Sequence, residues 1–342
     1  MAYTTINKSS DYFNTKLYTG GSGNTAHTGV GFQPDLVWIK ERTRVRNHAW
    51  FDAIRGARYW IGSNSNGAQD YNSGAYLVSL DSDGFTTTDT DVVGKNGLTY
   101  ASWNWKANGA GSANTAGSIN STVSANTTSG FSIVKWTGTG SAGTIGHGLG
   151  SAPLIVLYKS ISGSSNWYFY TYQIDGSSDE LALNLTEGKT DRSLTAPTSS
   201  LFYVDGQSER NGSGATQLAY CFAEKTGYSK FGSYVGNGSA DGAFIYTGFK
   251  PAFVLVKITS GSSDWILQDT KRSTVNVSNT VLYPNDSSSE DVNTIYNLDI
   301  LSNGFKTRTT HNRLNGSGST YIYMAFAEAP LVGTNNVPAT AR

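Results

Sequence analysis

The chain of 342 residues carries 25 Lys and Arg against 25 Asp and Glu, and only 15% of its residues are charged. This balance leaves no overall field that would draw the chain onto nucleic acid, and no apolar run reaches the ~20 residues that membrane insertion requires. The 39 Gly, together with 12% aromatic residues, argue against disorder and favour short β-strands joined by tight turns.

The N-terminal region and the single cysteine indicate where the chain is made. Residues 1–16 are polar and lack the apolar core of a secretion signal, so we expect synthesis in a cytoplasm without a signal peptide. Cys221 lies in the apolar segment 218–223, where a buried small side chain is the expected state. A single cysteine excludes an intramolecular disulfide.

One pattern of segments occurs three times along the chain. Each copy begins with a Gly- and Pro-containing turn that leads into an apolar strand, and continues with a polar loop and a second, aromatic strand. It ends with an Asn-Gly turn and a further apolar strand. The turn-and-strand segments are 31–40, 148–159 and 248–257, the aromatic strands are 47–52, 165–169 and 263–267, and the closing segments are 96–105, 211–224 and 315–328.

The pattern predicts an all-β fold of three tandem antiparallel β-sandwich domains of the jelly-roll or lectin-like kind. The near-continuous apolarity of the first strand in each copy indicates a central strand covered on both faces. We divide the chain by composition and repeat boundaries. The predicted parts are an N-terminal docking segment (1–16), repeat 1 (17–107), a Gly/Ser/Asn/Thr-rich linker (108–130), repeat 2 (131–226), repeat 3 (227–331) and a C-terminal tail (332–342).

The sequence offers little support for a metal site or a cofactor. None of the four His has another ligand at metal-binding spacing, and we expect no cofactor. Asp81 and Asp83 lie in an oxygen-rich segment that resembles part of a calcium loop. The remaining EF-hand positions are missing, however, and the third copy has Leu301 and Asn303 there. A turn is sufficient to explain the two aspartates.

The acids do not suggest catalysis. A glycosidase needs two carboxyl groups that face each other across a cleft. Asp52, Asp175 and Asp269 are the acids that follow the aromatic strand in the three copies, and we expect them to cap or ion-pair with turns. The sequence therefore predicts a protein that is not an enzyme.

Two sets of residues could bind a ligand. Trp50, Trp167 and Trp265 recur in the aromatic strands and could stack on a sugar, although a core role is favoured because the residue recurs in all three copies. The basic run could contact an acidic polysaccharide or a partner subunit, or form a solvated hairpin loop. Its three arginines are Arg42, Arg44 and Arg46.

Several of the repeated strings, in order, resemble the repeated domain of tail-fibre-like structural proteins of bacteriophages, particularly marine phages. The strings that carry the resemblance are 31–40, 51–57, 79–85, 101–106, 227–234 and 325–330. The resemblance covers nearly the whole chain. The resemblance implies a protein of the virion surface that contacts other virion proteins. It also implies a host-surface glycan as a candidate ligand and a homo-oligomer, expected to be a trimer.

Three functions remain open from the sequence. The first is a tail fibre or host-attachment component that binds a cell-surface receptor, and the second is a capsid decoration protein or head appendage. The third and most remote is an enzyme that degrades polysaccharide. The first two need the same stable, charge-balanced and loop-rich β-domains, so the sequence does not separate them.

Overall fold

The apolar strand that the sequence repeats lies inside a sheet in each copy, as predicted. These strands are β3 (Leu36–Glu41), β14 (Ile155–Ser160) and β22 (Phe249–Ile258), and each pairs with a strand on both sides. All six residues of β3 and of β14 are buried. Both faces of each central strand are therefore covered.

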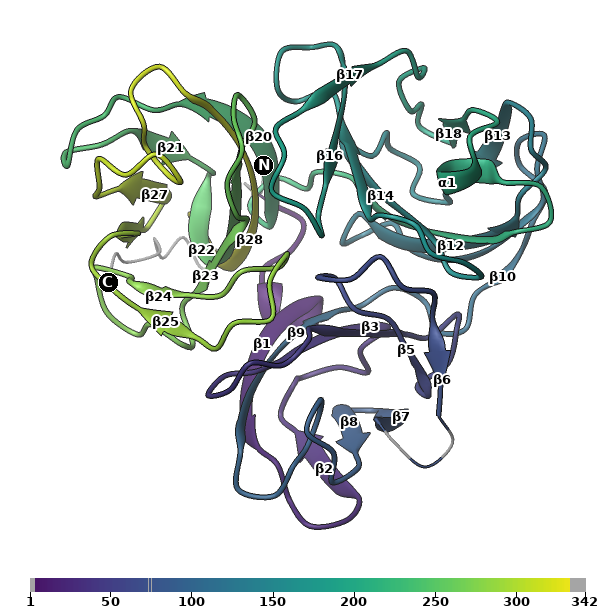
Figure 1. The fold of residues 1–342 in the computed structure, drawn as a ribbon, viewed down its shortest axis with the longest axis horizontal. Helices are drawn as coiled ribbons and strands as arrows, with labels where there is room; N and C mark the ends of the chain where they lie inside the picture. Colours follow the sequence, from purple (N-terminus) through teal and green to yellow (C-terminus); the bar gives the residue numbers. More distant parts are fainter. Residues whose placement is uncertain (1–3, 73, 75, 333–342) are drawn as a thin grey trace.

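The computed structural model describes residues 4–72, 74 and 76–332, and its strands form three lobes around a common centre (Figure 1). The predicted all-β class is confirmed, since every strand ladder is antiparallel and the two helices among the described residues are single turns. Neither of these helices has the length and apolar character that a membrane crossing needs.

Each lobe has a main sheet and smaller accessory sheets. Lobe 1 contains η1 (Ser9–Asp11), β1 (Phe13–Thr19), β2 (Thr25–Thr28), β3, β4 (Ala49–Asp52), β5 (Tyr59–Trp60), β6 (Asp70–Tyr71), β7 (Leu77–Asp81), β8 (Gly84–Thr87) and β9 (Thr99–Trp105). Its sheets are ordered β1-β9-β3-β4, β2-β8-β7 and β5-β6.

Lobes 2 and 3 repeat this arrangement with local changes. Lobe 2 contains β10 (Ser112–Asn114), β11 (Ser121–Asn126), β12 (Phe131–Thr137), β13 (Gly143–Gly146), β14, β15 (Tyr168–Thr171), β16 (Ser178–Ala182), β17 (Thr190–Arg192), β18 (Leu201–Val204), α1 (Ser208–Asn211) and β19 (Thr216–Phe222). Lobe 3 contains β20 (Ser229–Val235), β21 (Phe244–Tyr246), β22, β23 (Ile266–Asp269), β24 (Thr280–Val281), β25 (Asp291–Val292), β26 (Leu298–Leu301), β27 (Gly304–Thr307) and β28 (Thr320–Pro330). The main sheets are ordered β10-β11-β12-β19-β14-β15-β16-β17 and β20-β28-β22-β23.

The two faces of each main sheet contribute to different cores. In β3, for example, Leu36 and Trp38 face a central core shared by all three lobes, whereas Val37 and Ile39 face a core inside lobe 1. This alternation follows from the two-residue period of a strand. The three lobes therefore share one core and form a single body, in addition to having a core of their own.

The structure corrects two of the predicted boundaries. Segment 108–130 is not a linker, because β10 and β11 lie within it and β11 pairs along its whole length with β12. The predicted docking segment 1–16 belongs in part to lobe 1, where Ile6 and Phe13 are buried in the central core. Of the predicted tail 332–342, residues 333–342 lie outside the described residues.

The strand registers define which residues of the three lobes are equivalent. Trp38 pairs with Trp50, Leu157 with Phe169, and Leu255 with Leu267. Trp50 therefore does not correspond to the two tryptophans that it seems to match in the sequence. The position two residues before Trp50, Phe169 and Leu267 is therefore equivalent in the three lobes. It is occupied by His48, Trp167 and Trp265.

A ring nitrogen at this position links each lobe to the next. The indole N–H of Trp38 can only donate, and it lies 2.8 Å from Nδ1 of His48, so this nitrogen accepts and Nε2 carries the proton. Imidazole and indole thus play the same part in a closed cycle. The three bonds run from His48 Nε2 to the carbonyl of Tyr283 (3.0 Å), from Trp167 Nε1 to that of Gly62 (2.7 Å) and from Trp265 Nε1 to that of Ala182 (2.9 Å).

Backbone hydrogen bonds between the lobes follow the same threefold pattern. In one set, an N–H at the start of each aromatic strand donates to a loop carbonyl of the neighbouring lobe. In the second set, an N–H of that loop region donates to a carbonyl just after the central strand of the first lobe. The first set is Arg46 N to Ser287 O (2.9 Å), Ser165 N to Asn66 O (2.8 Å) and Ser263 N to Thr186 O (2.8 Å), and the second is Gln69 N to Ile161 O (3.1 Å), Lys189 N to Thr259 O (2.9 Å) and Glu290 N to Arg42 O (2.7 Å).

Equivalent aromatic residues close the opposite end of the central core. Trp105, Phe222 and Phe326 come from the three lobes, and their ring centroids lie 5.6 to 6.5 Å apart in every pairing. Beside them, the buried carboxylates of Asp52 and Asp269 each accept a bond from an aromatic side chain of another lobe. The donors are Tyr220 (2.8 Å) and Trp103 (3.1 Å), respectively.

The equivalence of the lobes predicts a compensating exchange in lobe 1. Trp38→Leu should lower the free energy of unfolding by about 3 kcal/mol through cavity formation, and His48→Trp by about 2 kcal/mol through overpacking. The double variant reproduces the Leu and Trp pair of lobes 2 and 3. In urea denaturation, the decrease in the free energy of unfolding of the double variant should be smaller than the sum of the two single decreases by at least about 2 kcal/mol. Additive losses would contradict the assigned equivalence.

His48 also predicts a loss of stability in acid. Burial, with Lys40 nearby, lowers the pKa of His48 well below 6.5. The unfolded chain therefore takes up a proton that the folded chain does not, and stability falls by about 1.4 kcal/mol for each pH unit below 6.5. Urea midpoints measured between pH 5 and pH 7 should fall less steeply for the Trp38→Leu/His48→Trp variant than for the wild type. Both proteins keep His27, His147 and His311, whose pKa values are also lowered mainly by burial, so the difference in slope reports His48.

Candidate ligand-binding site

The three predicted tryptophans cannot stack on a ligand, because the structure places all of them in the central core. Their exposed fractions are 3% for Trp50, 0% for Trp167 and 1% for Trp265. The rings of Trp50 and Trp167 lie 5.1 Å apart across the boundary of lobes 1 and 2. The core role that the sequence favoured is correct for all three.

The basic run is ion-paired rather than a free cationic loop. Arg42 forms a bidentate pair with Glu290 of lobe 3, with distances of 2.9 Å from Nε and 2.7 Å from Nη2. Arg44 and Arg46 each lie 2.9 Å from a carboxylate oxygen of Asp91. The run therefore joins lobe 1 to lobe 3 and to its own loops, which leaves little unpaired charge for an acidic polysaccharide.

The weak calcium candidates form a turn, as the alternative explanation predicted. The carboxylate of Asp83 accepts bonds from the backbone N–H groups of Gly29 (3.0 Å) and Gly31 (2.6 Å), and these bonds lower its pKa. Asp81 accepts a bond from the Thr86 hydroxyl at 2.7 Å. These carboxylates brace the loop between β7 and β8.

A second group of acids lies at the edge of lobe 2 and already holds a cation. The carboxylates of Asp175, Asp179 and Asp191 lie within 4.8 Å of one another. The ammonium group of Lys189 sits among them, at 2.6, 2.7 and 2.6 Å respectively. Three opposite charges at hydrogen-bond distance raise the pKa of Lys189, so the lysine stays charged and occupies the position that a metal ion would take.

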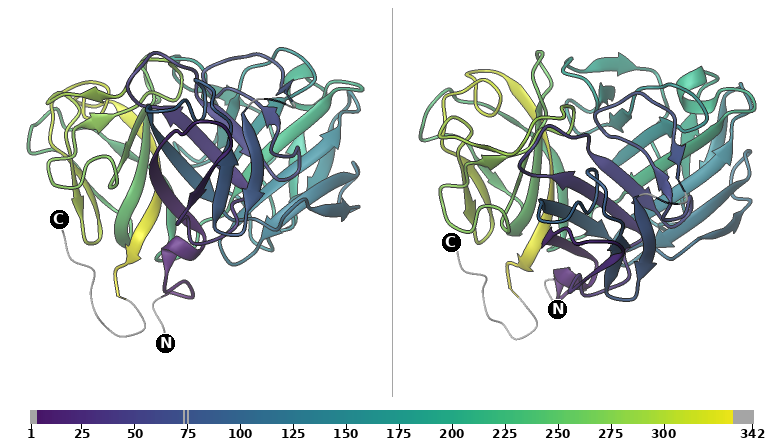
Figure 2. Two further views of the ribbon diagram at one scale, coloured as in Figure 1. Left: turned by 90° about the horizontal axis from the view of Figure 1, so that it is seen from below. Right: turned by 60° about the horizontal axis from the view of Figure 1, so that its bottom comes forward.

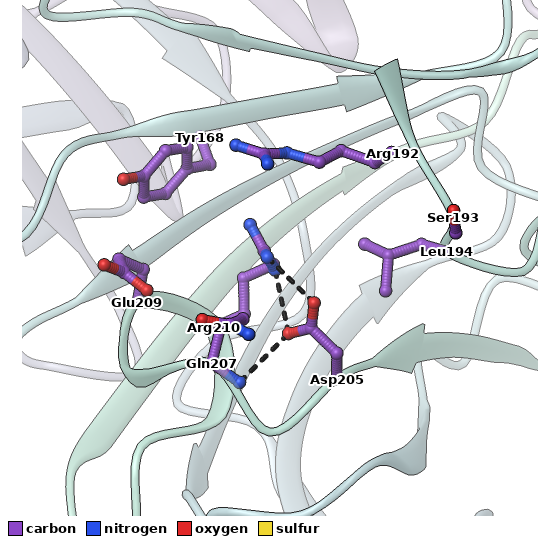
Figure 3. A pocket seen from close by; sticks show the side chains of 8 residues that line it. All are labelled: Tyr168, Arg192, Ser193, Leu194, Asp205, Gln207, Glu209 and Arg210. Atoms are coloured by element: carbon purple, nitrogen blue, oxygen red, sulfur yellow. Dashed lines mark hydrogen bonds and ion pairs between the residues drawn. The ribbon is translucent and has the colours of Figure 1, made fainter. Parts of the chain in front are cut away.

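A polar hollow lies on the surface of lobe 2 (Figure 3). Its volume is about 430 Å³, and its walls come from β15, the end of β17 with the residues that follow it, the loop between β18 and α1, and α1 itself. The residues that line it are Tyr168, Arg192, Ser193, Leu194, Asp205, Gln207, Glu209 and Arg210. This set is rich in hydrogen-bonding groups and includes one aromatic ring.

Charged side chains form the base of the hollow. Arg210 is buried and bonds the carboxylate of Asp205 through Nε (3.1 Å) and Nη2 (2.8 Å), while Nη1 pairs with Glu180. Arg192 bonds the other oxygen of Glu180 at 2.6 Å. The guanidinium carbon of Arg210 also lies 5.7 Å from the ring centroid of Tyr168. Both arginines are thereby fixed before any ligand arrives.

Lobe 3 shows that the fold does not require this network. Strand registers and turn contacts make Glu180 equivalent to Val281 and Arg210 equivalent to Leu314. Val281 and Leu314 are fully buried in the apolar core of lobe 3. A buried ion pair is rarely more stabilising than well-packed apolar residues, because both charges must leave water. The charged base of the hollow is therefore a specialisation of lobe 2.

The protonation state of the network follows from its contacts. Burial raises the pKa of Asp205, but the bonds from Arg210 outweigh burial and bring the pKa below its ordinary value. Asp205 is thus ionised at neutral pH and acts as an acceptor. The hollow presents fixed acceptors and donors, which suits recognition of a polar ligand by hydrogen bonds.

Sequence reasoning missed every residue of this hollow. Arg192, Asp205 and Arg210 lie in polar segments without a repeated motif, and sequence spacing does not reveal that they meet. A signal was available in the comparison of the copies. Charged residues stand in lobe 2 where the third copy has Val281 and Leu314, but recognising this requires the strand register.

A single family covers the three lobes. Residues 8–330 match the family described as a domain of unknown function (DUF7483), and the chain belongs to that family. The match includes the whole repeated body and the hollow of lobe 2. No curated protein matches the chain.

The lobe comparison yields a test of the buried network. Arg210→Leu should lower the free energy of unfolding by about 3 kcal/mol, because Glu180 then loses one of its two cationic partners in a buried site. Adding Glu180→Val should restore most of this loss by recreating the apolar pair of lobe 3. Urea denaturation of the single and double variants measures both effects. A double variant no more stable than Arg210→Leu would show that lobe 2 cannot accept the apolar pair.

Proposed function

We propose that the chain is a non-enzymatic component of a phage virion surface, a tail fibre or host-attachment protein that binds a cell-surface receptor. The observation that carries this proposal is the polar hollow of lobe 2, with its preset charged base, on an otherwise ion-paired and rigid body. The resemblance of the repeated strings to phage tail-fibre-like proteins supports the same function.

The position of the hollow is suited to display. Figure 2 shows that η1 and the end of β28 lie at one end of the body, whereas α1, which lines the hollow, lies at the opposite end. A partner that holds the body near η1 and β28 would leave the hollow facing outward. Receptor-binding sites generally lie on loops that a rigid scaffold positions, and the interlobe hydrogen bonds supply such a scaffold.

The state of the acids supports binding rather than hydrolysis. A glycosidase needs a carboxylic acid that remains protonated to donate to the leaving group. Asp205 is held ionised by Arg210. Of the three acids that the sequence singled out, Asp52 and Asp269 are buried and pair with Arg55 and Arg272, and Asp175 pairs with Lys189. None of these acids is placed to act as a general acid on a substrate.

Locating the protein on purified particles tests the proposal. Antibody labelling, or cryo-EM of particles that carry the protein, should place it at the tail, and the isolated protein should compete with particles for adsorption to host cells. Density over the capsid lattice, with no competition for adsorption, would contradict host attachment and indicate a capsid decoration protein.

A further inference from the structure

A second hollow adjoins the first on the same end of the body. Its volume is about 260 Å³, and it is lined almost wholly by hydroxyl and amide side chains. Tyr168 and Glu209 line both hollows and therefore form the ridge between them. The remaining lining residues are Asn66, Ser160, Ser164, Ser165, Asn166 and Ser208.

The second hollow lies where lobe 1 meets lobe 2. Asn66 belongs to lobe 1, and its backbone carbonyl accepts bonds from the N–H of Ser165 (2.8 Å) and the ammonium group of Lys159 (3.0 Å). Lys159 is buried, and burial lowers its pKa to about 8. This wall of the hollow is therefore held in place by the interlobe contacts.

An ion pair bridges the equivalent place in lobe 3. Asn166 corresponds to Asp264, and each accepts a bond from an equivalent asparagine amide at 2.9 Å and 2.8 Å. Glu209 corresponds to Arg313, whose guanidinium lies 2.8 Å from the Asp264 carboxylate. Lobe 2 lacks this ion pair, because Asn166 is uncharged and Glu209 is an acid where lobe 3 has an arginine. The gap between these two positions is thereby left open.

The carboxylate of Glu209 has no partner of its own. Within the part of the chain that the structure describes, it makes no hydrogen bond or ion pair, although its half-buried side chain lines both hollows and lies on the same side of the first hollow as Tyr168 (Figure 3). A half-buried carboxylate that lacks a donor is available to a ligand that brings one. It also disfavours an anionic ligand.

We infer that the two hollows form one groove that binds a linear oligosaccharide of at least two sugar residues, neutral or amino-bearing, across the ridge of Tyr168 and Glu209. Sugar hydroxyls can donate to Glu209 and Asp205 and can exchange bonds with the Ser and Asn side chains, while a sugar face can contact the Tyr168 ring. The inference rests on the proposed function and names its ligand class.

A variant that closes the groove provides the test. Asn166→Asp with Glu209→Arg grafts the ion pair of lobe 3 onto lobe 2, and Asp264 shows that the fold accepts an acid at the first position. The control, Asn47→Asp with Glu187→Arg, makes the same change of charge. Asn47 is the equivalent of Asn166 in lobe 1, and Glu187 is exposed.

The readout is binding of the purified protein to an array of bacterial oligosaccharides and polysaccharides. Wild type and control should bind linear neutral or amino-bearing glycans, and the closing variant should bind them at least about tenfold more weakly with an unchanged melting temperature. Glu209→Gln, which keeps the shape of the side chain, should weaken binding less than closure does.

Several results would overturn the inference. They are the absence of binding to every arrayed glycan, selective binding of acidic glycans, equal binding by the closing variant, and equal loss in the control. Binding only to a protein of the host envelope would likewise replace the saccharide with a protein receptor. Because the array uses isolated protein, its outcome is independent of where the protein lies on the particle. A failed saccharide inference can thus be told apart from a failed host-attachment proposal.

Discussion

The structure depends on the hydrogen bond from a buried ring nitrogen of each lobe to a backbone carbonyl of the next. His48, Trp167 and Trp265 occupy one equivalent position and make this bond in a closed cycle. An unpaired buried carbonyl or N–H would cost about 1–3 kcal/mol, so each bond selects the orientation in which the lobes meet. Separating any lobe would also expose the apolar inner face of its main sheet.

Closure of the cycle explains which positions the lobes have kept and which have diverged. Lys40, Lys159 and Lys257 are identical and buried, and all three donate to backbone carbonyls near the interfaces. Away from the interfaces the constraint is weaker. At the outer cores, Val281 and Leu314 of lobe 3 meet only their own lobe, and lobe 2 places a charged network there instead.

The sequence predicted what depends on local pattern and missed what depends on register. Strand periodicity was enough to identify β3, β14 and β22 as central strands, because burial of both faces leaves a continuous apolar run. Aligning Trp50 with Trp167 was wrong by two residues, since the strand pairing and not the residue type sets equivalence. The polar segment 108–130 resembled a linker because β10 is an edge strand with no buried residue, and β11, although paired on both sides, consists of Ser, Thr, Val, Ala and Asn without a large apolar side chain. The hollow of lobe 2 could not be predicted, because its walls come from four separate elements.

The interface of lobes 1 and 2 combines a rigid frame with an unfilled space, and this combination is what a binding groove requires. The carbonyl of Asn66 is fixed by two donors of lobe 2, so the wall cannot relax toward the ridge. In lobe 3 an ion pair spans the same gap, and the framework around it is unchanged. An open gap where lobe 3 has an ion pair, beside an unpartnered carboxylate, is not explained by folding stability. It is explained if a ligand supplies the missing donors.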